Sequence, residues 1–147
     1  MTTLRQCLTD DHRHCDDLFA AAEKAVAAKD FATARKAFDG FAQAMREHFA
    51  SEENTLFPRF EAATGSDAGP TRVMRLEHQQ MRALLDEAGK ALAVNAPDAY
   101  LGLADTLLIM MQQHNMKEEN VLYPMCDRHL APEVPQLVAA IRSQLGR

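Results

Sequence analysis

HFASEENTLFP (residues 48–58) and HNMKEENVLYP (residues 114–124) are two copies of one motif, separated by 66 residues. Each copy begins with a histidine, has a glutamate four residues later and reaches a proline ten residues after the histidine. A further histidine precedes each copy by 36 residues. The chain therefore carries the same set of side chains twice, at one fixed offset: His12, His48 and Glu52, then His78, His114 and Glu118.

The motifs lie in long segments whose apolar residues recur in steps of three and four, which is typical of amphipathic helices. These segments cover about residues 3–28, 31–60, 71–94 and 98–128, and a shorter one covers about 132–145. Because the connections are short, successive helices should be antiparallel neighbours. The sequence thus predicts an all-α, up-down-up-down four-helix bundle with a short extra C-terminal helix. We expect residues 1–147 to form a single domain, built from helical hairpins at about 3–62 and 70–128 and a C-terminal helix at about 132–145.

The repeated side chains should meet at one level of this bundle. His12 lies about 17 residues before the first turn and His48 about 18 after it, so each should be roughly 26 Å from that turn. The second hairpin has the same balance. A glutamate four residues after a histidine shares its face of the helix. Four imidazoles and two carboxylates should therefore point inward together.

Such a set has the chemistry of a metal site. Six inward side chains are too many for one tetrahedral zinc with an open position, but they suit two metals bridged by the two carboxylates. Mixed imidazole and carboxylate ligation favours iron, with manganese and zinc as competitors. The alternative is that these are core or surface residues without a metal. That alternative would leave buried polar groups without partners, at a cost of several kcal/mol each.

Other residues in or near the motifs are not expected to be metal ligands. Glu53 and Glu119 follow their histidines by five residues, off the ligand face, and should be solvated or support the ligands. Tyr123 follows His114 by nine residues and should lie on the opposite face. His14 and His129 are interpreted as a surface residue and a surface or helix-end residue. Pro58 and Pro124 should kink or end their helices. Cys15 should be either a buried free thiol or a neighbour of His12.

Charge, apolar runs and cysteine content argue against a nucleic-acid-binding, membrane-spanning or disulfide-rich secreted protein. The net charge of −5 offers no basic surface for nucleic acid. No apolar run approaches the roughly 20 residues of a membrane span, and the first residues lack a signal-peptide pattern. Three cysteines form no even disulfide framework, which fits a reducing cytoplasm. A homodimer or an unknown protein partner is compatible with the sequence.

The chain resembles the hemerythrin-like proteins, in particular their His-His-Glu cation-binding branch. The resemblance covers about residues 4–128 and rests on DDH (10–12), LEHQQM (76–81) and the two long motifs. It implies a non-haem, carboxylate-bridged centre of two iron ions, whose ligands would be His12, His48, Glu52, His78, His114 and Glu118. The oxygen-carrying members have an extra histidine where this chain has Arg82, and an aspartate five residues after the fourth-helix histidine instead of Glu118. Fewer protein ligands leave more room at each iron for water, O₂ or NO.

These comparisons lead to two functional hypotheses of different classes. The first is a non-enzymatic di-iron protein that binds, senses or responds to O₂, NO or peroxide, or handles iron. The second is a small oxidase-like enzyme, namely a ferroxidase, a peroxidase or an NO-reducing centre, acting on a small inorganic substrate. Reversible oxygen binding and a purely structural metal site remain as further alternatives.

Overall fold

The computed structural model describes residues 1–147 and contains helices and no strand, which confirms the all-α prediction. The elements, in chain order, are α1 (Leu4–Ala27), α2 (Phe31–Ser51), η1 (Glu52–Leu56), α3 (Phe57–Thr64), α4 (Pro70–Ala93), α5 (Pro97–Lys117), η2 (Glu118–Leu122), α6 (Tyr123–His129), η3 (Ala131–Glu133) and α7 (Val134–Leu145).

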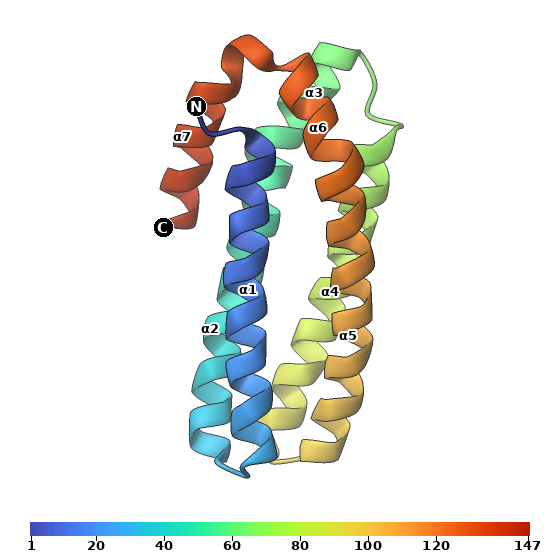
Figure 1. The fold of residues 1–147 in the computed structure, drawn as a ribbon. Coiled ribbons are helices and arrows are strands. Elements are labelled where there is room, and N and C mark those ends of the chain that lie inside the picture. The colour runs from blue at the N-terminus through green and yellow to red at the C-terminus, as the bar shows by residue number, and fades with distance from the viewer.

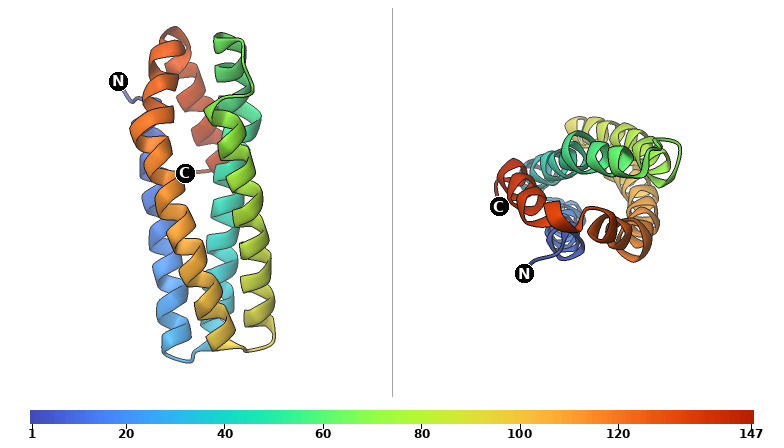
Figure 2. Two further views of the ribbon diagram at one scale, coloured as in Figure 1. Left: turned by 90° about the vertical axis from the view of Figure 1, so that its right-hand side faces the viewer. Right: turned by 90° about the horizontal axis from the view of Figure 1, so that it is seen from above.

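Four long helices make up the body of the molecule, as predicted. Figure 1 shows α1 and α2 as one antiparallel pair and α4 and α5 as the other. Seen from above, the four helices surround a common axis (Figure 2). The short helix α7 folds back along α1 and α2, so the chain ends against the outside of the first hairpin.

Local signals explain where the helices begin and end. Thr3 caps α1 in a reciprocal arrangement with Gln6, and Asp30 caps α2 by accepting a hydrogen bond from the Thr33 N–H. The turns that close the two hairpins each contain one residue in the left-handed region, Lys29 (φ 58°) and Asn95 (φ 53°). The two hairpins are thus closed by similar tight turns.

The sequence pattern suggested one continuous helix in each of the second and fourth segments, and the structure differs from that expectation. Each contains a five-residue π-helical turn, η1 or η2, that begins at the motif glutamate. The proline that follows has no N–H, and its ring would clash with the carbonyl four residues earlier. The wider turn accommodates it, and Pro58 becomes the second residue of α3, where no N–H is needed. The expectation that the prolines end their helices was therefore wrong, because the helical structure continues directly from η1 into α3 and from η2 into α6.

Two apolar clusters fill the bundle, and one polar layer separates them. The cluster near the hairpin turns contains Phe19, Phe38 and Phe41, whose rings pack at 5.4–5.9 Å. The other cluster joins the start of α1 to α3, α6 and α7. His12 lies between Leu8 of one cluster and Cys15 of the other. Apolar side chains thus pack the helices together on both sides of the polar layer.

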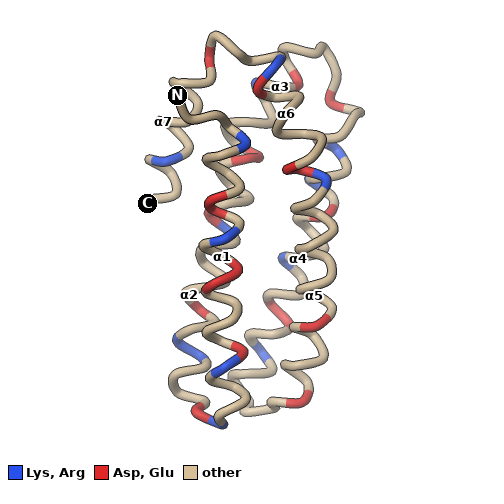
Figure 3. Tube along the Cα trace, in the orientation of Figure 1, with Lys and Arg blue, Asp and Glu red and all other residues tan.

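Residues of both charge signs are distributed along the bundle (Figure 3). None of the helices is both long enough and apolar enough to cross a lipid bilayer.

Replacing Phe41 with alanine should lower the free energy of unfolding by about 3–5 kcal/mol, because the ring is fully buried and its removal leaves a cavity. Urea unfolding followed by circular dichroism measures this change. Leu76→Ala is the matched control, because Leu76 is 54% exposed and should change stability by no more than about 0.5 kcal/mol. Equal losses for the two variants would contradict the assignment of the core.

Candidate metal centre

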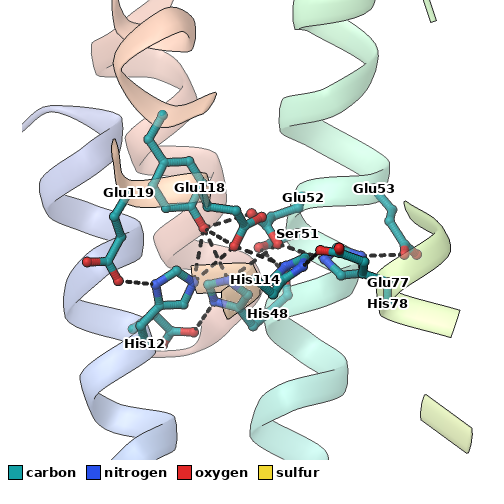
Figure 4. A network of polar contacts seen from close by, with 12 residues as sticks. His12, His48, Ser51, Glu52, Glu53, Glu77, His78, His114, Glu118 and Glu119 are labelled. Atoms are coloured by element: carbon teal, nitrogen blue, oxygen red, sulfur yellow. Dashed lines mark hydrogen bonds and ion pairs between the residues drawn. The ribbon is translucent and has the colours of Figure 1, made fainter. Parts of the chain in front are cut away.

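The structure brings all six repeated side chains to one level of the bundle. His12 comes from α1, His78 from α4, and each remaining histidine lies in the last turn of α2 or α5. The two glutamates begin the π turns. All six are at most 4% exposed. Figure 4 shows their polar ends converging between the helices: His12, His48, Glu52, His78, His114 and Glu118.

The imidazoles form two pairs, one from each hairpin. The ring centres of His12 and His48 are 4.7 Å apart, and those of His78 and His114 are 4.9 Å apart. Within each hairpin, one histidine comes from each helix, so the pair spans the hairpin interface.

Each carboxylate reaches one imidazole of both pairs. Glu52 Oε1 lies 3.3 Å from His48 Nε2 and 3.2 Å from His78 Nε2. Glu118 Oε1 lies 3.1 Å from His12 Nε2 and 3.2 Å from His114 Nε2. The two carboxylates therefore connect the two hairpins, in the way that carboxylates bridging two cations would.

A second ring of carboxylates fixes the orientation of the imidazoles. The Nδ1 atom of every motif histidine lies 2.7–2.8 Å from a carboxylate oxygen. A carboxylate beside Nδ1 favours the tautomer that carries its proton on Nδ1, and that tautomer leaves the Nε2 lone pair for a cation. The four pairs are His12 with Glu119, His48 with Asp11, His78 with Glu53, and His114 with Glu77.

Two residues of this ring, Glu53 and Glu119, were expected from the sequence either to be solvated or to support the ligands. Their carboxylates contact His78 and His12. Asp11 and Glu77 were missed, although a signal was present. Each immediately precedes a motif histidine, and the two are separated by the same 66 residues as the rest of the repeat.

Three of the outer carboxylates are themselves held by cations. Arg82 makes two hydrogen bonds to Glu53, at 2.8 and 2.9 Å. Arg147 Nε donates to Asp11 at 2.7 Å, and Lys117 pairs with Glu77. Arg82 thus supports His78 through Glu53, and its guanidinium also lies 5.3 Å from the centre of the Phe49 ring.

Tyr123 was expected on the opposite face of its helix, and this expectation was wrong. The π turn η2 contains one more residue than an α-helical turn. Tyr123, nine residues after His114, therefore takes the rotational position that residue i+8 would have in a continuous α-helix. Positions i and i+8 share a helical face. The Tyr123 hydroxyl is accordingly buried in the centre, 2.8 Å from Glu52 Oε2 and 2.9 Å from Glu118 Oε1.

The donor set fits a bound cation. Four inward polar atoms of the cluster are buried and have no aligned hydrogen bond: Glu52 Oε1, His78 Nε2, His114 Nε2 and Glu118 Oε2. Glu52 Oε1 and His78 Nε2 are only 3.2 Å apart, yet they are not aligned to bond each other. Buried polar groups left without partners require an explanation, and a shared ion provides one.

The electrostatics of the site also favour a positive charge. Burial opposes protonation, but the nearby Glu118 carboxylate raises the pKa of His114 to about 9, and Glu52 raises the pKa of His48 in the same way. Burial likewise disfavours the Glu52 carboxylate, yet the charge on His48 holds its pKa well below the ordinary value. The cluster without a metal thus attracts protons, which a metal cation would replace.

The remaining sequence expectations concern residues outside the centre. His14 is half-buried at the surface, and His129 is exposed at the last residue of α6, as interpreted. Cys15 is a free thiol within the apolar cluster, where burial raises its pKa to about 11. That environment makes it an unreactive core residue.

Replacing Glu53 with glutamine should weaken cation binding by about 10- to 100-fold, because the neutral amide no longer makes the His78 imidazole a stronger donor. Glu119→Gln should do the same through His12. Competition with a chromophoric chelator for Co²⁺ measures the affinity. The exposed Glu87 supplies the control substitution Glu87→Gln, and an equal loss there would count against a specific role for the outer ring.

Comparison with known proteins agrees with this geometry. The chain is 25% identical over 134 residues to an uncharacterized hemerythrin-like protein of Schizosaccharomyces pombe. The alignment covers 90% of this chain but only 64% of that relative, so the chain spans less than two thirds of its length. No solved structure gives a significant match. The family model of the hemerythrin HHE cation-binding domain matches residues 3–126, and the chain therefore belongs to that family.

Proposed function

We propose that this chain is a non-haem di-iron protein that binds, senses or responds to O₂, NO or peroxide, or handles iron. One observation carries the proposal: each of two buried carboxylates contacts one imidazole of both pairs. Two cation positions, bridged by Glu52 and Glu118, account for this arrangement better than one. In this proposal the whole chain, residues 1–147, acts as one domain around the centre.

The proposed ligands are the six repeated side chains, with two imidazoles at each position. Two imidazoles and two bridging carboxylates give each position four protein donors, which suits iron and leaves room for exogenous ligands. A pair of bound iron ions would supply open positions for a small molecule and a change of oxidation state. Manganese and zinc are the competing metals.

The surroundings restrict what can reach the centre. The six side chains are at most 4% exposed, and the polar layer lies between two apolar clusters. The Phe49 and Phe57 rings stack against His78, at 4.2 and 5.9 Å between ring centres. An organic substrate has no room there. The burial therefore favours O₂, NO or peroxide as the ligand.

A second candidate is a small oxidase-like enzyme with ferroxidase, peroxidase or NO-reducing activity. The observation in its favour is the Tyr123 hydroxyl, which places one hydrogen-bond donor against the carboxylates at the centre. Reversible oxygen binding is a third alternative. It is less favoured because Arg82, at the place of the oxygen carriers' additional histidine, is bound to Glu53 and offers no lone pair.

The cellular setting is part of the proposal. We infer a cytoplasmic protein, which the three buried free cysteines support. Its output as a sensor would pass to a protein partner or through a homodimer.

Protein purified from iron-replete cells without chelator should contain about two iron ions per chain. After anaerobic reduction, it should form NO adducts and be oxidised by air, instead of cycling O₂ reversibly, because each iron has few protein ligands. Elemental analysis and stopped-flow optical spectra test both points. Stoichiometric adducts support binding or sensing, and repeated turnover of Fe²⁺, peroxide or NO supports the enzyme. One tight zinc per chain, with no second site on iron loading, would refute the di-iron proposal.

Metal removal should lower the thermal midpoint but preserve the helical circular dichroism spectrum. The metal-free site must hold two carboxylates and four imidazoles without the cation that neutralises them. The apolar clusters on either side still hold the helices together. Melts of chelator-treated and reloaded protein make the comparison, and superimposable curves would contradict the expectation.

A further inference from the structure

At one pair of equivalent positions, the two halves of the centre differ by a single hydroxyl group. The repeat places Tyr123 and Phe57 at equivalent positions, 66 residues apart. Each ring stacks on the equivalent imidazole: Tyr123 on His12 with ring centres 5.7 Å apart, and Phe57 on His78 with ring centres 5.9 Å apart. Both rings are fully buried. At this pair of positions the ring stacking is alike, and the phenolic oxygen is the difference between the two side chains.

That hydroxyl contacts the first imidazole pair. It lies 3.2 Å from His12 Nε2 and 3.4 Å from His48 Nε2. It also donates towards Glu52 Oε2 and Glu118 Oε1, which share its one proton. The polar atoms on this side of the centre thus already lie within hydrogen-bond distance of the hydroxyl.

The second pair has no such partner. His78 Nε2 and His114 Nε2 lack aligned hydrogen bonds, as do the two carboxylate oxygens that the hydroxyl does not reach, Glu52 Oε1 and Glu118 Oε2. Side-chain donor atoms of Glu52, His78, His114 and Glu118 lie within 4.8 Å of one another. This half therefore presents a preformed, unsatisfied donor set to a cation.

We infer that the two cation positions are inequivalent, and that the Tyr123 hydroxyl makes them so. The His78/His114 position is filled first, because a cation there breaks no hydrogen bond. A cation at the His12/His48 position must displace the hydroxyl from the carboxylate oxygens and from the space beside both imidazoles. Losing hydrogen bonds to charged groups corresponds to an affinity about 10- to 100-fold weaker. The inference rests on the proposed two-metal centre and assigns an order of loading to it.

Calorimetric titration of the metal-free full-length protein with Co²⁺ tests the order. The wild-type protein should show two binding phases that differ by at least about 10-fold in affinity. His78→Ala should remove the tight phase and His12→Ala the weak phase. Equal affinities in the wild type, or loss of the tight phase in His12→Ala, would overturn the inference.

Exchanging the hydroxyl between the halves tests its cause. Tyr123→Phe should strengthen the weak phase by about 10- to 100-fold and leave the tight phase unchanged. Phe57→Tyr places a hydroxyl beside His78 and should weaken the tight phase, which keeps the inference testable if Tyr123→Phe fails to fold. A weak phase that is unchanged or further weakened in Tyr123→Phe would overturn it. So would a tyrosinate-to-iron absorption band in the iron-loaded wild type, because Tyr123 would then be a ligand.

Failure of this inference is distinguishable from failure of the proposed function. Two ions per chain with equal affinities contradict the order of loading and leave the two-metal centre intact. One ion per chain in the wild type and in both aromatic variants contradicts the two-metal centre itself.

Discussion

The arrangement of the centre depends on four hydrogen bonds from imidazole Nδ1 atoms to carboxylates. Each bond points one side of a ring outward and thereby commits the opposite Nε2 atom to the middle of the bundle. Two of the bonds, Glu53 with His78 and Glu119 with His12, join one hairpin to the other. The other two, Asp11 with His48 and Glu77 with His114, join the helices within a hairpin. The same contacts that orient the donors therefore tie the two hairpins together.

Burying the polar layer costs free energy, and the apolar clusters on either side of it hold the helices together without it. Two buried carboxylates repel each other and need positive charge, which imidazole protons supply without a metal and a cation would supply with one. Apolar clusters above and below keep the helices packed in either case. We therefore expect the fold to survive removal of the proposed cation.

The π turns show how a local irregularity serves the site. Each begins at a motif glutamate, so the carboxylate still faces its histidine four residues earlier, at 3.2–3.3 Å. Each residue after the turn lies, around the helix axis, where the preceding residue would lie in a continuous α-helix. This shift brings Tyr123 into the centre and Phe57 against His78. The π turn before each proline therefore sets the helix face on which the following aromatic residue lies.

The sequence alone determined the bundle and the six inward side chains, because helical periodicity and an internal repeat of constant spacing can be read along a single chain. It also contained the acidic residues that orient the rings, although Asp11 and Glu77 become meaningful only beside histidines 37 residues away. Tertiary structure decided the rest. The position of Tyr123 depends on the π turn, whose extra residue breaks the periodicity on which face assignments rest. The commitment of Arg82 to Glu53 and of Arg147 to Asp11 depends on how α4 and the end of the chain pack against their neighbours. Contacts between distant segments carry no periodic signal, so a single sequence could not show them.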